Sequence, residues 1–206
     1  MAQTNPQAAA QEFLAAIEGR RWREAAALVD PEQLAPYREE TLAILVAWAQ
    51  QRDEIRKQAL RGGGELTALS TDGKLDPQAL ARVGDTRLPP TRGVRTLRDL
   101  AALSPAEFLA HVLELADIRS IGRGGFIDPS THRIFGAVNE SDSVAYVLYR
   151  AEGPGVRYDD PYYVEVFPTV RRGDRWYVHG SHRGAGFTRL AFLIARLDEQ
   201  DAERPK

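Results

Sequence analysis

The chain has 206 residues and a net charge of −2, and 43% of its residues are hydrophobic, which is enough for a folded core. This balance gives no sign of binding to nucleic acid or to an anionic membrane. The absence of cysteine excludes disulfides, thiolate metal ligands and a cysteine nucleophile. No apolar run is long enough to span a membrane. The first residues lack the features of a signal peptide, so we expect a cytoplasmic protein, with a trimmed exported protein as the open alternative.

The first 60 residues are predicted to be helical. Asn5 and Pro6 are a typical helix start, and this first helix is expected to end near Gly19. A second short helix spans residues 22–29. A third spans residues 31–60 and ends where Arg61 is followed by three glycines, each of which costs ~1 kcal/mol in a helix relative to alanine.

The middle of the chain is less regular. Residues 62–95 are rich in Gly, Pro, Thr and Asp, and we expect a loop-rich excursion or lid with a short helix at residues 76–83. A further helix is predicted for residues 104–117, because Ser104 and Glu107 have the spacing of a capping box.

Beyond about residue 134 the pattern changes to strands. Three runs rich in valine and tyrosine, at residues 144–150, 162–170 and 175–181, predict an antiparallel meander. An amphipathic segment at 188–201 predicts a final helix. We therefore expect a single α+β domain over residues 1–206, in which N-terminal helices pack in a curved antiparallel sheet, as in the cystatin-like α+β roll.

The last hairpin is predicted to have a three-residue loop, Arg172-Gly173-Asp174, with Gly173 in a left-handed conformation. Val170 then pairs with Trp176. This register is preferred because it gathers the apolar residues of both strands on one face. The residues on that face are Tyr162, Val164, Val166, Val170, Trp176 and Val178.

The same register sets Glu165 diagonal to His179 on the other face, within reach for a carboxylate and an imidazole. Such a pair is a candidate catalytic base in a shielded pocket; an ordinary ion pair on a solvated or dimer-forming face is the alternative. Neighbouring strand residues are candidates for ligand binding, namely Tyr149, Tyr163, Phe167, Tyr177 and Ser181.

Metal and cofactor sites are not expected. His179 and His182 would project to opposite faces of a strand, and only two other histidines are present. The glycine-rich segments do not lie in the strand-to-helix context of a nucleotide-binding loop. The start of the last predicted helix, near Arg183, stays open as an anion site.

Two segments resemble a known superfamily. Residues 9–16 with 21–28 look like an opening helix pair, and residues 164–178 look like a closing hairpin. Both are similar to the nuclear transport factor two-like superfamily, which includes ketosteroid isomerases, scytalone dehydratase and polyketide cyclases. The resemblance implies a cone of sheet around helices, a pocket at its open end and frequent dimerisation through the sheet. It transfers no catalytic residue, because these domains include enzymes, binders and structural proteins.

Three functions remain open. The first is a non-catalytic domain that binds a small apolar or amphipathic ligand in the cone, or that serves assembly, with a homodimer through the sheet. The second is a cofactor-independent enzyme that transfers a proton, with Glu165 or His179 as the base and Tyr163 or Tyr177 polarising the substrate. The third is a protein-interaction module that uses the open sheet face.

Overall fold

The computed structural model describes residues 5–60, 74–91, 93–120, 131–152 and 164–180. The described part of the chain is a mixed α+β structure with two antiparallel sheets, which confirms the predicted class. Its elements, in chain order, are α1 (Pro6–Glu18), α2 (Trp22–Ala27), α3 (Pro31–Leu60), α4 (Pro77–Val83), β1 (Arg87–Thr91), β2 (Val94–Thr96), α5 (Leu97–Ala101), α6 (Pro105–Ser120), β3 (Thr131–Asn139), β4 (Val144–Glu152), β5 (Glu165–Arg172) and β6 (Arg175–Val178).

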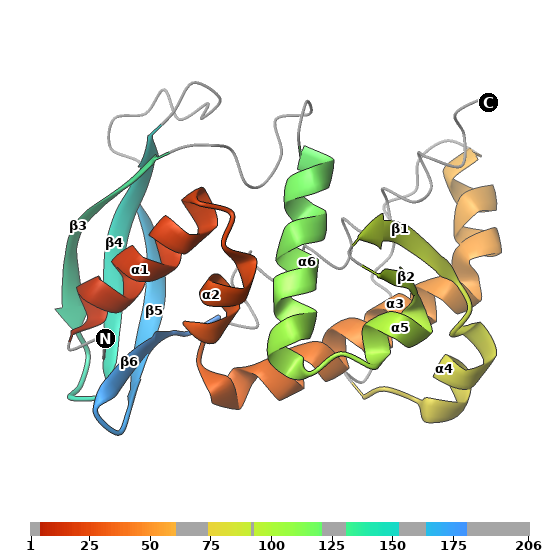
Figure 1. Ribbon diagram of the computed structural model, residues 1–206, viewed down its shortest axis with the longest axis horizontal. Helices are drawn as coiled ribbons and strands as arrows, with labels where there is room; N and C mark the ends of the chain where they lie inside the picture. Colours follow the sequence, from red (N-terminus) through yellow and green to blue (C-terminus); the bar gives the residue numbers. More distant parts are fainter. Residues whose placement is uncertain (1–4, 61–73, 92, 121–130, 153–163, 181–206) are drawn as a thin grey trace.

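The two sheets lie in different parts of the molecule (Figure 1). The larger sheet has the order β3-β4-β5-β6 and stands at one end with α1 across it. At the other end, α4, α5 and the β1–β2 hairpin gather beside α3. None of the helices, within the residues described, is long and apolar enough to cross a membrane.

The helices predicted from capping residues close to their first turn are confirmed. The side chain of Asn5 accepts a hydrogen bond from the Ala8 amide at 2.8 Å, which caps α1. Before α6, the Ser104 hydroxyl donates to Glu107 at 2.6 Å and the Ser104 amide bonds the same carboxylate, as in a capping box. The helix expected at residues 188–201 lies outside the described residues.

The excursion expected at residues 62–95 is corrected in its described part. The short helix expected at residues 76–83 is confirmed as α4, whereas the β1–β2 hairpin was not predicted. Leu88 and Val94 are buried in the main hydrophobic core, so this segment is a core element and not a lid. Apolar residues between turn signals can form a short buried hairpin, although prolines lower their strand propensity.

The predicted register of the last hairpin is wrong by one residue. Arg172 pairs with Arg175 and Arg171 pairs with Trp176, so the loop has two residues, Gly173 and Asp174. Gly173 has a φ of 64°, the left-handed conformation that was expected of it. A slip of one residue moves side chains to the other face. The expectation failed because it placed all the valines on one face, whereas this sheet is apolar on both.

Pro168 explains where β6 ends. The His179 amide donates a hydrogen bond to the Pro168 carbonyl at 2.9 Å. In an antiparallel pair, the backbone N–H of residue 168 would donate the second hydrogen bond, to the His179 carbonyl. Proline has no N–H group to supply it. The strand ends at Val178, before Ser181, which lies outside the described residues together with Tyr163.

The buried residues form a large and a small cluster. The large cluster joins the helical part and includes Phe108, Leu109 and Val112 of α6. The small one joins Ala9 of α1, Ala145 of β4 and Trp176 of β6. We call the sheet face that packs on α1 the inner face, and the opposite one the outer face.

Candidate functional site

The structure does not bring Glu165 and His179 together as a pair. Glu165 projects from the inner face, because it alternates with Phe167 and with the fully buried Thr169. His179 lies opposite Pro168, three residues along β5 from Glu165, and pairs with groups near the start of α3. The two residues predicted as one site therefore belong to two separate polar clusters, and their catalytic role stays a prediction.

Around Glu165, the inner face carries a polar and aromatic cluster. The Tyr149 hydroxyl of β4 donates to the Glu165 carboxylate. The Tyr149 and Phe167 ring centroids are 4.9 Å apart, and Phe167 meets Phe13 of α1 at 6.3 Å. Tyr149 and Phe167, two of the predicted ligand-binding residues, are thus neighbours on this face.

His132 and Glu18 complete this cluster. Glu18, the last residue of α1, accepts hydrogen bonds from the His132 amide at 2.7 Å and from His132 Nδ1 at 2.8 Å. The His132 ring lies 5.8 Å from the Tyr149 ring. We call Glu18, His132, Tyr149, Glu165 and Phe167 the inner-face cluster. The sequence offered one signal for His132, its alternation with Ile134 at the start of β3.

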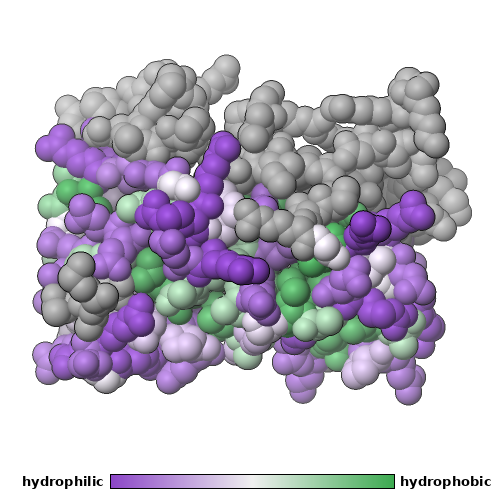
Figure 2. Space-filling view, viewed as in Figure 1, coloured by the Kyte–Doolittle hydropathy of each residue, from purple (hydrophilic) through white to green (hydrophobic). Residues whose placement is uncertain are grey.

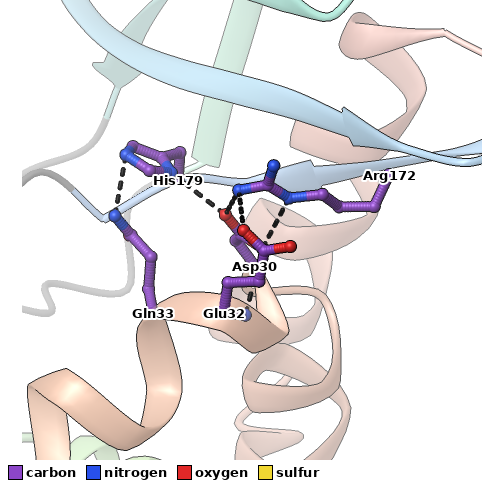
Figure 3. Close-up of polar contacts among 5 residues, drawn as sticks. All are labelled: Asp30, Glu32, Gln33, Arg172 and His179. Atoms are coloured by element: carbon purple, nitrogen blue, oxygen red, sulfur yellow. Dashed lines mark hydrogen bonds and ion pairs between the residues drawn. The ribbon is translucent and has the colours of Figure 1, made fainter.

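A second cluster, the Asp30 cluster, consists of Asp30, Glu32, Gln33, Arg172 and His179 (Figure 3). Asp30 follows α2 and is fully buried. Arg172 reaches both of its oxygens, with Nε to Oδ1 at 3.2 Å and Nη2 to Oδ2 at 2.8 Å. The Glu32 amide and His179 Nδ1 also contact this carboxylate, at 3.2 Å and 3.3 Å. Such a two-pronged pair is the strong form of an arginine–carboxylate contact.

The charges in this cluster are mutually stabilised. Burial of Asp30 by itself raises the pKa of its carboxyl, but the hydrogen bonds from Arg172, the Glu32 amide and His179 together hold that pKa below its ordinary value. His179 Nε2 lies 2.7 Å from the Gln33 side-chain nitrogen, so both ring nitrogens are occupied. The cluster therefore links the start of α3 to the β5–β6 hairpin and offers no unoccupied base.

The outer face of the sheet is apolar and partly exposed, since Val170 on this face is buried. Four large side chains on it are exposed, namely Phe135 (47%), Val138 (60%), Tyr146 (38%) and Val166 (54%). Arg133 and Arg150 lie over the Phe135 ring at 5.4 Å and 5.3 Å. Tyr177 pairs with Val170 on this same face, so it is separated from Phe167, with which it was predicted to bind a ligand.

The view in Figure 2 shows a different surface character. Among the residues that Figure 2 colours, most on this side are hydrophilic, and hydrophobic ones emerge among them mainly over the helical part of the molecule. Exposed apolar residues scattered in this way need no special explanation.

No group of three or more histidine and acidic side chains among the described residues is arranged to hold a metal ion. The segment around Arg183 lies outside those residues. No protein-family model matches this chain. Searches of curated proteins and of solved structures likewise found no significant match.

Proposed function

We propose that this chain is a non-catalytic α+β roll, similar to the nuclear transport factor two-like domains, and that it serves assembly through the outer face of its sheet. The partner is a second copy of the chain. The observation that carries this proposal is the exposed apolar set Phe135, Val138, Tyr146 and Val166 on neighbouring strands. Contiguous exposed apolar surface on a protein marks an interaction site.

The charges at the two ends of this face support a symmetric pairing. Arg133 and Arg150 pair across β3 and β4 at one end. Glu140 and Asp142 lie in the β3–β4 turn at the other end, where Glu140 accepts a hydrogen bond from Tyr146 at 2.7 Å. A two-fold axis across the strands reverses one copy on the other, so the arginines meet the carboxylates. The apolar side chains between them would then be covered.

The oligomeric state tests this proposal. Native mass spectrometry and light scattering are expected to show a dimer of the full chain. Val166→Asp would bury an unpaired carboxylate and should weaken association at least ~100-fold. Arg133→Glu should weaken it as well, and adding Glu140→Arg should restore part of the loss. Glu24→Arg, on α2 away from this face, is the matched control.

A wild-type chain that stays monomeric at every concentration tested would overturn the assembly proposal. A dimer that survives Val166→Asp unchanged would place the interface elsewhere and would also count against it. Circular dichroism of each variant distinguishes a lost interface from a lost fold.

A second candidate function is the binding of a small apolar or amphipathic ligand on the inner face. It is favoured by the run of ring contacts from Phe13 through Phe167 and Tyr149 to His132. Rings with a few polar groups beside them are typical of ligand sites. Native mass spectrometry of protein purified from its own host, beside a denatured control, should reveal a stoichiometric molecule that is lost on denaturation. An empty protein would contradict this candidate.

A further inference from the structure

The two edges of the larger sheet differ in how they are covered. At the β6 edge, the Val178 amide donates to the Leu28 carbonyl at 2.9 Å and the Asp30 amide donates to the Val178 carbonyl at 2.8 Å, so the start of α3 runs alongside the strand. At the other edge, β3 has no strand beside it among the described residues and lies on the outside of the molecule (Figure 1). An open edge presents unpaired backbone donors and acceptors, to which another strand can add.

The β3–β4 turn shows which backbone groups of β3 face outward. The Glu140 amide donates to the Val144 carbonyl at 2.9 Å, so these two residues form a hydrogen-bonded pair. Such pairs alternate along an antiparallel ladder, and the register therefore turns the backbone groups of Ala137 and Asn139 away from β4. Within the part of the chain that the structure describes, these outward groups have no backbone partner.

The first half of the β3 edge is closed. The His132 amide points away from β4, because it donates to the Glu18 carboxylate of α1 at 2.7 Å. A bulge between Ile134 and Gly136 then interrupts the regular row of donors and acceptors. Charged side chains and bulges at an edge both hinder the addition of a strand. The stretch that can accept one is therefore short, at residues 137–139.

We propose that residues 137–139 pair with the same residues of a second copy of the chain, antiparallel across a two-fold axis. Ala137 of each copy then opposes Asn139 of the other, because only residues whose backbone groups face outward can form hydrogen-bonded pairs, and each such pair exchanges two hydrogen bonds. This interface uses the edge of the sheet and not its outer face, so it goes beyond the assembly proposed above.

The side chains of this stretch are complementary to themselves. Val138 meets its own copy at the axis as a non-hydrogen-bonded pair, in which side chains lie closest. Val138 is also the most exposed large apolar residue described, at 60%, and the contact would cover part of it. The reversal brings Arg133, near the start of β3, toward Asp142 in the turn of the other copy. A parallel pairing would instead set like charges side by side.

The edge and the outer face together predict a tetramer. The axis of an antiparallel edge pair is perpendicular to the sheet, so the outer faces of both copies lie on the same side and can each pack on a further copy. Two kinds of two-fold interface of this sort close into a tetramer. Because the edge pair is short, it should form only at higher concentration than the face-to-face dimer.

Ala137→Pro tests the edge without changing the outer face. Proline removes the outward N–H and is tolerated on edge strands where that group faces solvent. Over a concentration series in light scattering and native mass spectrometry, the wild type should pass from dimer to tetramer. Ala137→Pro should weaken this second step at least ~10-fold, because each copy loses a backbone hydrogen bond. Ala137→Ser keeps the N–H and is the matched control, and circular dichroism checks the fold.

Hydrogen exchange of the wild-type chain tests the same pairing without a substitution. The amides of Ala137 and Asn139 should exchange as exposed amides do at low concentration, and at least ~10-fold more slowly where the tetramer forms. Contact through the outer face does not bond these amides. The His132 amide, which donates to Glu18 within one copy, should not respond to concentration and is the internal control.

The outer-face variant separates this proposal from the one above. If only the edge pairs, the wild type and Val166→Asp should form the same dimer, and Ala137→Pro should abolish it. A tetramer that forms as readily with Ala137→Pro as in the wild type would overturn edge pairing. So would exchange of the Ala137 and Asn139 amides that stays fast at every concentration, while a dimer sensitive to Val166→Asp would still support the outer face.

Discussion

At the scale of single residues, burial decides what an ionisable group contributes. His111 lies in α6 among apolar neighbours and is almost fully buried. Burial disfavours its charged form and lowers its pKa from 6.5 to about 4. Helix α6 packs against α2 and α3, which lie far from it along the chain, so the depth at which its residues are buried could not be predicted from the helix alone.

This shift predicts a pH dependence of stability. Between pH 6.5 and pH 4 the unfolded chain binds a proton on His111 and the folded chain does not, so the free energy of unfolding falls as pH is lowered. The loss is on the order of 3 kcal/mol across this window. Urea unfolding at pH 7 and pH 4.5 should show it, and His111→Leu should reduce the difference between the two. An equal pH dependence in both proteins would contradict the assignment.

At the scale of elements, a prediction from sequence succeeds where the residues that determine the helix or strand lie close together in the chain. The caps at Asn5 and at Ser104 involve residues within three positions, so the sequence sufficed to place α1 and α6. Helix α5 was missed, although Thr96 and Asp99 form a capping box that the sequence contains. The β5–β6 register depended on which face the apolar residues share, and that required knowledge of how the whole sheet is covered.

In the candidate site too, contacts between residues that are far apart in the chain could not be predicted from the sequence. Tyr149, Glu165 and Phe167 were predicted to be functional, and they meet because β4 and β5 pair in register. Glu18 was not predicted, since 114 positions of sequence separate it from its partner His132. Asp30 was not predicted as a site residue for the same reason, because its partners Arg172 and His179 are far away along the chain.

The Asp30 cluster links elements, and its loss should be costly. Arg172→Met leaves a buried carboxylate without its main partner, and we expect a loss of about 3 kcal/mol at pH 7. Arg171→Met changes the neighbouring arginine, which is exposed and bonds only the Gly173 carbonyl among the described contacts, and should cost little. Denaturant unfolding compares the two variants with the wild type.

The pH dependence of this loss has a definite sign. The folded pKa of Asp30 lies below its ordinary 3.8, so the stabilisation is complete above about pH 4 and is lost as pH falls through the folded pKa. The gap between wild type and Arg172→Met should therefore narrow below pH 4. Equal costs for Arg171→Met and Arg172→Met would refute the importance of the cluster.

At the scale of the whole molecule, the two ends have unequal cores. The helical end buries large side chains such as Phe108, Leu42 and Leu45. The sheet end is held by α1 on one face, where Trp176 packs on two alanines, while the outer face exposes several apolar residues. Regions with less buried apolar surface open at lower free energy than the rest of a protein.

This difference predicts two levels of protection in native-state hydrogen exchange. Amides of β4 and β5 should exchange through a smaller opening than those of α6, because less apolar surface is exposed when the sheet end opens. The experiment uses the Val166→Asp chain, so that assembly adds no protection to the sheet. Trp176→Ala, which removes the largest side chain of the small cluster, should lower protection in β4 and β5 by ~3 kcal/mol or more and leave α6 nearly unchanged. Equal losses in both would mean that the Asp30 cluster couples the two ends into one cooperative unit.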